Sequence, residues 1–207
     1  MANTIKTNPS TIFQAGDKIG TYHLADNPNL FEIQRNNNYE FLIMDIDGIR
    51  RAGMTGSEDS SVSNIANAQE IIRLSVTQAS VPHFTQQPIE VKRGNSTLKY
   101  AGVPSFQSGT IVVNDFIGAP AKEVLMAWQN LSYNVQTEKV GLASDYKKDC
   151  KLLEYTPDYQ LVRTWILHGC WISGLSEDNY DSESNNKHSV NCTIEYDRAE
   201  VDTSSEV

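Results

Sequence analysis

The chain has 207 residues, 39% of them hydrophobic and 21% charged, which is typical of one globular domain rather than of a disordered polymer. Its formal net charge of −9 at pH 7 disfavours binding of nucleic acid through a general basic surface. The start of the sequence lacks the basic residues and apolar run of a signal peptide, and no apolar stretch is long enough to span a bilayer. We therefore expect a protein made in the cytoplasm, without membrane contact.

The N-terminal part of the sequence predicts an arm, a deep strand and a long loop. Residues 1–35 are rich in Asn, Thr, Pro and Gly and form an N-terminal arm or extension without a core of its own. A strand is predicted at 39–46. Apolar residues would lie on both of its faces, as expected of a strand that is covered on two sides. Residues 47–67 collect Gly, Ser and charge without a period and predict an extended loop. We expect one domain over residues 36–200, followed by a flexible tail at 201–207.

Strand patterns continue through the middle of the chain. Apolar and polar residues alternate at 70–79, which predicts a strand with one buried face. A hairpin is predicted at 89–100, because Gly94–Asn95 separates two β-prone runs. The run GTIVVNDF at 109–116 predicts a further strand.

One helix is predicted at 119–134, APAKEVLMAWQNLSYN. Pro120 suits the first helical turn, and five apolar residues recur at helical spacing: Ala121, Val124, Leu125, Trp128 and Leu131. We expect this face, with Trp128 at its centre, to cover the open side of the β-structure.

Three strands are predicted in the last third of the chain, at 150–155, 159–172 and 188–196, with an acidic loop at 176–186 before the last. The whole pattern predicts a mainly β fold: an antiparallel β-barrel or sandwich with one packed α-helix, an extended loop and an N-terminal arm.

Two histidine–cysteine pairs are the strongest candidates for chemistry. His168-x-Cys170 and His188-x-x-x-Cys192 would each place two metal ligands on one strand face. Neither spacing matches a zinc knuckle, and strand interiors disfavour a reactive thiol. With Cys150, the cysteines are odd in number, and we expect all three to be reduced and buried. We therefore expect no metal site here.

Other candidates are weaker. The acidic pair Glu177–Asp178 and the basic pair Arg50–Arg51 are interpreted as solvated loop residues. The sequence has no phosphate-binding glycine loop, no G-x-S-x-G, no H-E-x-x-H and no calcium loop. We expect no catalytic residue, no cofactor and no enzymatic activity.

The order of six segments is more specific than any single motif. These segments are NNNYEFLI at 36–43, then 79–102, 110–116, AKEVLMAWQNL at 121–131, 145–175 and 188–200. The more specific parts are Trp128–Gln129 in a helix that follows Asn114–Asp115, and the run 145–148 before the long hairpin, with Gly174–Leu175 after it. This succession resembles the tail tube protein of contractile-tailed bacteriophages over roughly residues 36–200.

The resemblance implies a β-barrel-like subunit that closes into hexameric rings, which stack head to tail into the tail tube of a virion. Genomic DNA would pass through the lumen without specific binding. Sheath, tape measure, baseplate and tail terminator proteins would be its partners. Neighbouring copies would cover the second apolar face of the hairpin at 145–175. Because the N-terminal arm and the 47–67 loop are long, polar and without a core of their own, we expect them to make contacts between stacked rings.

Alternatives remain open. The arm before Asn36 and the 47–67 loop depart from the family pattern, so the chain could instead be a tube-end, baseplate or neck ring protein. A secretion-system tube subunit shares the fold. A carbohydrate-binding β-sandwich is another class, with exposed aromatic residues as the sugar platform, and an enzyme is the third. The exposure of the tryptophans distinguishes a tube subunit from a carbohydrate-binding sandwich, because a tube subunit should bury them.

Overall fold

The computed structural model describes residues 33–50, 65–177, 181–183 and 185–202. Strands predominate in it, which confirms the predicted mainly β class. The strands are β1 (Tyr39–Ile43), β2 (Val76–Ala79), β3 (Phe84–Gln86), β4 (Ile89–Arg93), β5 (Ser96–Tyr100), β6 (Pro104–Phe106), β7 (Gly109–Asn114), β8 (Tyr133–Asn134), β9 (Lys139–Val140), β10 (Lys148–Tyr155), β11 (Leu161–Glu177), β12 (Ser189–Glu195) and β13 (Arg198–Val201). The helices are α2 (Ala68–Ser75), α3 (Ala121–Ser132) and α4 (Ala143–Tyr146).

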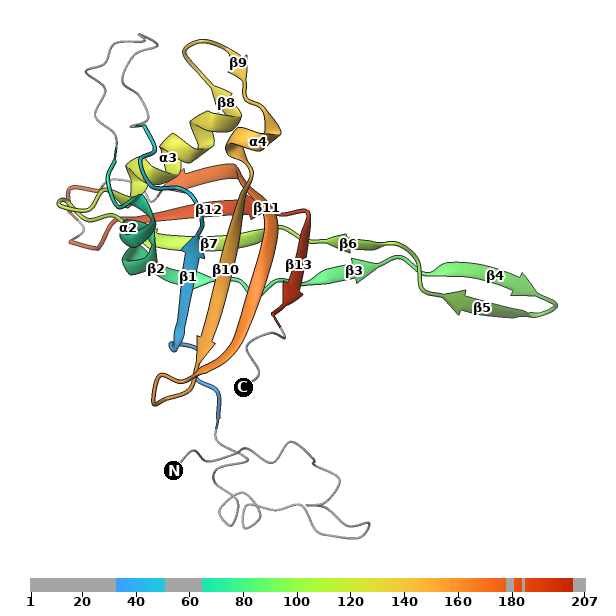
Figure 1. Ribbon diagram of the computed structural model, residues 1–207. Coiled ribbons are helices and arrows are strands. Elements are labelled where there is room, and N and C mark those ends of the chain that lie inside the picture. The colour runs from blue at the N-terminus through green and yellow to red at the C-terminus, as the bar shows by residue number, and fades with distance from the viewer. Residues whose placement is uncertain (1–32, 51–64, 178–180, 184, 203–207) are drawn as a thin grey trace, which may run out of the picture.

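Seven strands form one antiparallel sheet in the order β1-β10-β11-β12-β7-β2, with β13 paired to β11. The long strand β11 belongs to two halves of this sheet, because its first part pairs with β10 and β13 and its last part with β12. Figure 1 shows the strands of the two halves running in crossing directions. The outer strands β1 and β2 do not pair with each other, so this sheet stays open rather than closing into a barrel.

A β-bulge at Gly169 turns β11 from one half to the other. Gly169 has φ +66°, a conformation that glycine adopts without strain, and a Cβ here would collide with the Asp197 carboxylate. Leu167 is buried before the bulge, and Cys170 and Ile172 are buried after it. The bulge therefore places Leu167, Cys170 and Ile172 on one buried face, whereas Ile166 and Trp171, on the other face of the strand, are only partly buried.

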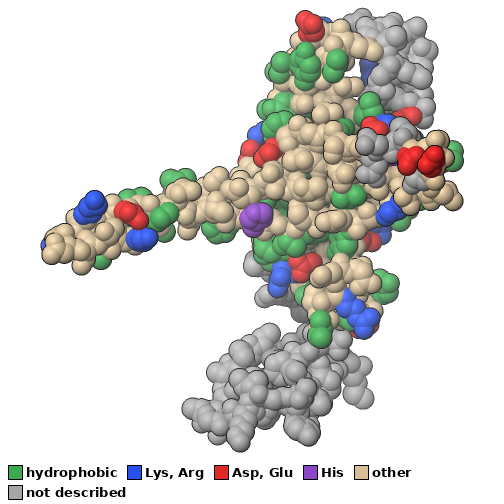
Figure 2. Space-filling view, turned by 180° about the vertical axis from the view of Figure 1, so that it is seen from behind, with side chains coloured by type: hydrophobic (Ala, Val, Ile, Leu, Met, Phe, Trp, Pro, Cys, Tyr) green, Lys and Arg blue, Asp and Glu red, His purple; other side chains and the backbone are tan. Residues whose placement is uncertain are grey.

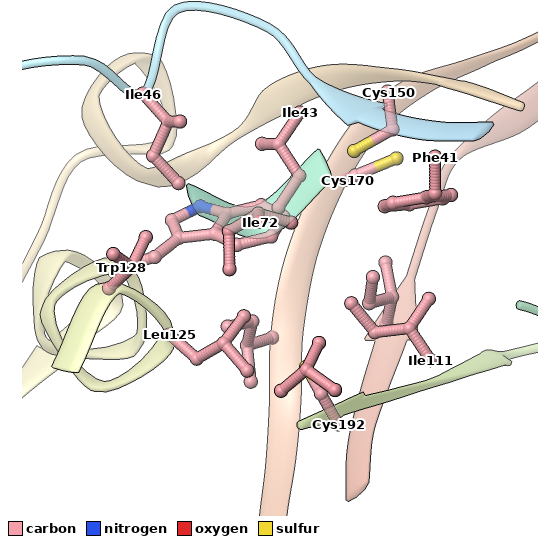
Figure 3. Packing of buried hydrophobic residues seen from close by; sticks show 14 of the residues in the cluster. Phe41, Ile43, Ile46, Ile72, Ile111, Leu125, Trp128, Cys150, Cys170 and Cys192 are labelled. Atoms are coloured by element: carbon pink, nitrogen blue, oxygen red, sulfur yellow. The ribbon is translucent and has the colours of Figure 1, made fainter. Parts of the chain in front are cut away.

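The core lies between the sheet and the helices. Trp128 on α3 is 1% exposed, and its indole N–H donates to the Tyr146 carbonyl at 2.8 Å, so the buried polar atom is satisfied. Figure 3 shows Trp128 and Leu125 directed from α3 toward the strand residues. This confirms the predicted helix and its buried face. Other fully buried residues are Ile43, Ile46, Ile72, Val113, Val124, Val190, Cys150, Cys170 and Cys192.

The predicted strand at 70–79 is wrong in its first part. The structure has the helix α2 at Ala68–Ser75, and only then β2. Ala68, Ile72 and Ser75 are buried, as helical spacing requires, whereas Leu74 is 70% exposed. In a segment of eight residues, the two periods cannot be separated by pattern alone. The predicted architecture with one packed helix therefore gains α2, which contacts β1, and the short α4, which contacts α3.

The hairpin at 89–100 is confirmed as β4 and β5 with the turn Gly94–Asn95. It is not part of the main sheet. Residues 82–107 project from the end of β2 and β7 as a narrow ribbon (Figure 1). From here on, this ribbon is called the arm; it is distinct from the N-terminal arm of residues 1–35.

Parts of four predicted segments lie outside the described residues: 1–32 of the N-terminal arm, 51–64 of the long loop, 178–180 and 184 of the acidic loop, and 203–207 of the tail. The tail was predicted to begin at 201, but Val201 still belongs to β13. The two ends of the long loop meet, because the Ile65 N–H donates to the Ile49 carbonyl at 2.9 Å and the Gly48 N–H to the Ile65 carbonyl at 3.2 Å. No helix within the described ranges has the length and apolar character needed to cross a membrane.

Candidate assembly surfaces

The half of the sheet that ends at β2 is a layer of four strands, β2, β7, β12 and Trp171–Glu177 of β11; we call it the β2 layer. Ser80, directly after β2, donates its N–H to the Thr110 carbonyl at 3.0 Å, so its amide faces β7. Because successive amides of a strand point to opposite sides, the Ala79 N–H points away from β7. No described strand pairs with that side of β2, which we call the β2 edge.

A groove of about 460 Å³ lies beside the β2 edge, with Tyr39, Ala79, Val81 and Leu152 in its lining. The Tyr39 hydroxyl is buried there and has no hydrogen-bond partner among the described residues, and burial raises the pKa of this phenol. A buried hydroxyl without a partner costs about 1–3 kcal/mol. The groove therefore combines an open strand edge with an unmet hydrogen bond.

The second edge of the β2 layer lies on β11. Pairing between β10 and β11 ends at Cys170, whereas pairing with β12 covers Trp171–Glu177 on the other side. Within the described chain, no strand pairs with the side of Trp171–Glu177 opposite β12; we call it the β11 edge. The β2 layer thus has open edges on both sides, and open edges are templates for strand pairing.

The arm has one apolar and one polar face. Directly opposed residues of an antiparallel pair share a face, and the pairs Ile89–Tyr100 and Val91–Leu98 form the apolar one. All four of these side chains are 45–56% exposed. The other face carries Glu90–Lys99, joined at 3.3 Å, and Lys92–Thr97. Figure 2 shows the arm standing clear of the body, with charged side chains near its tip.

Aromatic contacts anchor the arm to the core. The Phe84 and Phe106 rings lie 5.6 Å apart, and Phe106 lies 6.0 Å from Tyr196. The Tyr196 hydroxyl accepts the His83 N–H at 3.2 Å. The base of the arm, at β3 and β6, is therefore fixed to the main sheet, whereas β4 and β5 are exposed along their whole length.

The end of the β2 layer away from the arm carries another exposed apolar feature. After β7, the chain makes a turn at 116–119, closed by the Ala119 N–H and the Phe116 carbonyl at 3.2 Å. Ile117 is fully exposed and Phe116 is 48% exposed. The start of β12 lies at the same end, because Ser189 pairs with Asn114.

The structure separates the first predicted histidine–cysteine pair, His168 and Cys170. The bulge at Gly169 leaves His168 half-exposed between Asp149 and Glu200, at 3.4 and 3.3 Å, whereas Cys170 is buried. The prediction that His168 and Cys170 share a face is therefore wrong, because it assumed a regular strand. Across the part of the chain that the structure describes, no three His, Cys, Asp or Glu side chains are grouped to hold a metal ion.

All three cysteines are free and buried, as predicted. Burial raises the pKa of the Cys192 thiol to about 12 and that of Cys150 well above its usual value. Figure 3 shows the sulfur atoms of Cys150 and Cys170 within the core. Because the thiolate is the nucleophile, we expect no thiol of the folded protein to react with Ellman's reagent at pH 8, and all three to react in guanidinium chloride. Rapid labelling of one native thiol would contradict this packing.

The tryptophans are covered to different extents. The prediction that the tryptophans are buried is confirmed for Trp128, whereas it is wrong for Trp165 and Trp171, which are half-buried. The Trp165 N–H donates to Glu154 at 2.8 Å, and Trp171 lies edge-on to Tyr146 at 6.2 Å. None of the three indoles offers the exposed flat face that a sugar platform requires.

The sequence hypotheses overlooked the two edges and the arm. The hydrophobic pattern of a sequence indicates which residues are buried. It does not indicate which strands lie at an edge, because edge strands and central strands carry similar residues. The one available signal was the hairpin at 89–100, whose two apolar pairs face one side and have no second layer near them in sequence.

Comparison with known proteins identifies solved structures that share the fold of this chain. No family model matches the chain, and no curated protein matches it. A chain of the sheath–tube complex of the PVC extracellular contractile injection system is similar with a TM-score of 0.56 and 17% identity, over 89% of this chain and 98% of that one. The tube-terminating cap of the anti-feeding prophage gives 0.55 and 16%, over 91% and 97%. The PVC sheath/tube terminator gives 0.52 and 18%, over 79% and 92%.

Proposed function

We propose that this chain, which has the fold found in the tube, cap and terminator assemblies of contractile injection systems, is a structural subunit that forms hexameric rings stacked into a tube. The observation that carries the proposal is the β2 layer with its two open edges. The β2 edge of one copy pairs with the β11 edge of the next, and this heterologous contact closes a ring.

The groove beside the β2 edge supports the same contact. A strand from a neighbouring copy placed at this edge would receive the Ala79 N–H. It would also cover Val81, which is 53% exposed, in a groove lined mostly by polar residues such as Asn38 and Gln78. Main-chain hydrogen bonds supply affinity in such strand addition, and the side-chain pockets supply specificity.

The proposed setting is the tail of a contractile phage or a related injection machine. The similar chains come from a sheath–tube complex, a tube-terminating cap, a sheath/tube terminator and a baseplate. Sheath, terminator, baseplate and tape measure proteins are accordingly the partners we propose. We propose genomic DNA as the cargo of the lumen. A terminal ring or cap is the second candidate, because two of the similar structures are a cap and a terminator.

Imaging of the purified protein tests the proposal. We expect rings with sixfold symmetry and a central hole, and tubes of many rings if the chain is the repeating subunit. Single rings that never stack would favour the cap or terminator. Sedimentation as a compact monomer at high concentration, in every buffer tested, would contradict assembly.

A wall that lets DNA slide must hold it weakly. The net charge of −9 opposes phosphate binding, and basic contacts would make binding fall steeply with salt. We expect assembled tubes to bind a labelled duplex weakly at 50 mM salt, with little further loss at 200 mM. Tight, salt-sensitive binding in the lumen would contradict a passive wall.

A further inference from the structure

We infer that the tube presents an almost uncharged wall to its cargo, formed by the face of the β2 layer that points away from the core; we call it the bare face. The inference rests on the proposed function and deepens it, because it names the residues that the cargo meets. Cargo then slides because this wall carries almost no charge of either sign, and not because the chain as a whole is acidic.

Hydroxyl, amide and small side chains cover the bare face. β7 and β12 bury alternate residues in the core, so the residues between them lie on the opposite face. Directly opposed residues of an antiparallel pair share a face. Those of the bare face form the pairs Thr110–Thr193, Val112–Asn191 and Asn114–Ser189.

The outer strands of the layer continue this surface without adding charge. Ser176 of β11 opposes Asn191, and Gly174 opposes Thr193. On the other side, Gln78 of β2 opposes Val112. Figure 2 shows the body beside the base of the arm as a largely uncharged surface.

One charged residue of the four described strands lies on the bare face, namely Glu195, opposite Trp171. The charges at the far ends of the strands turn the other way. The Asp115 carboxylate accepts the Lys122 N–H at 3.3 Å, and Glu177 pairs with the Lys122 Nζ at 2.7 Å. Both carboxylates therefore face α3, so they add no charge to the bare face.

The opposite outward face of the protein is charged. It belongs to the β1 layer, formed by β1, β10, β13 and the first part of β11. Lys151 opposes Ile166, which opposes Glu200, and Glu40 lies in the next row opposite Leu153. The two outward faces of the protein therefore offer different surfaces to a charged polymer.

Ring closure decides which outward face meets the cargo. Three antiparallel steps separate β11 from β2, so the two strands run in opposite directions, and the β11 edge meets the β2 edge of a rotated copy as an antiparallel pair. The β2 layers of all copies then join into one closed sheet. The core, α3 and the β1 layer lie on one side of it (Figure 1). Because a ring has more room at larger radius, this bulky side faces outward and the bare face lines the lumen.

A wall of this composition has little affinity for charged cargo. It offers phosphates no basic side chain, so the counterion release that drives binding to DNA is absent. One carboxylate in each copy is also too few to hold a basic segment or to repel DNA strongly. Passage should therefore depend little on salt.

Cysteine labelling tests the orientation of the layer. Thr193→Cys places a thiol on the bare face, Lys151→Cys places one on the β1 layer, and the native cysteines are buried. In assembled tubes, N-ethylmaleimide should label both variants, whereas an antibody-coupled maleimide should label Thr193→Cys at least tenfold more slowly than Lys151→Cys. Thr193→Cys subunits kept unassembled by Ala79→Pro, which removes the N–H at the β2 edge, should react with both reagents.

Uptake of a labelled duplex tests the charge of the wall. In wild-type tubes, the duplex protected from nuclease should change less than twofold between 50 and 200 mM salt. Asn191→Lys with Thr193→Lys should raise the protected duplex at least tenfold at 50 mM salt, and this gain should be lost at 200 mM. Gln136→Lys with Thr137→Lys, in the exposed turn between β8 and β9, adds the same charge, but duplex bound there should remain open to nuclease.

The outcomes separate the hypotheses. Equal labelling of Thr193→Cys and Lys151→Cys by the antibody reagent in tubes, or nuclease-sensitive duplex on the Asn191→Lys, Thr193→Lys variant, would overturn the bare face as the wall and leave the tube function standing. Uptake by wild-type tubes that rises several-fold with salt would reveal repulsion and overturn the neutral wall. Wild-type protein that forms no rings would overturn the proposed function, and this inference with it.

Discussion

Replacement of Trp128 with alanine is expected to lower the free energy of unfolding by about 3 to 5 kcal/mol, because it empties a large buried site. The side chain is 1% exposed and packs between α3 and the sheet with Leu125 and Ile72. The substitution also leaves the Tyr146 carbonyl without the indole N–H that it accepts at 2.8 Å. Urea denaturation followed by circular dichroism measures the loss.

Met126 provides the matched control on the same helix. It is 37% exposed, so Met126→Ala should cost less than about 1 kcal/mol. If Trp128→Ala unfolds at the wild-type urea concentration, α3 does not pack on the sheet as the structure has it, and the interpretation of the core is wrong.

Replacement of Ala79 with proline is expected to abolish ring formation while the subunit stays folded. Proline has no N–H, and it is tolerated on an edge strand where that N–H faces away from the ladder. The Ala79 N–H points away from β7, toward the β2 edge. The variant therefore loses a hydrogen bond that only a neighbouring copy would accept. Negative-stain images and sedimentation velocity should show subunits in place of rings.

Ala79→Val is the control, since it keeps the N–H and favours a strand. It should form rings, and thermal unfolding of the proline variant should show that the subunit is still folded. Normal rings from folded Ala79→Pro protein would exclude the β2 edge from ring closure.

Much of the architecture was predictable because its causes are local. The helix α3 follows from Pro120 and from apolar residues at helical spacing, and the hairpin of the arm follows from Gly94–Asn95 between two β-prone runs. The strand phase that buries Val190, Cys192 and Ile194 also follows from a period of two. The candidate assembly surfaces were not predictable in this way, since a strand edge is defined by which strands are missing beside it.

The sequence by itself determined the mainly β character, the antiparallel pairing through short turns, the main helix and the buried cysteines, because each depends on residues close together in the chain. Only the tertiary structure decided three features. α2 is a helix because Ile72 and Ala68 meet the core of a sheet built from distant strands. β11 bends at Gly169 because Asp149 and Asp197, twenty or more residues away, surround that backbone. The edges at β2 and β11 stay open because the sheet order, set by long-range pairing, places no described strand beside them.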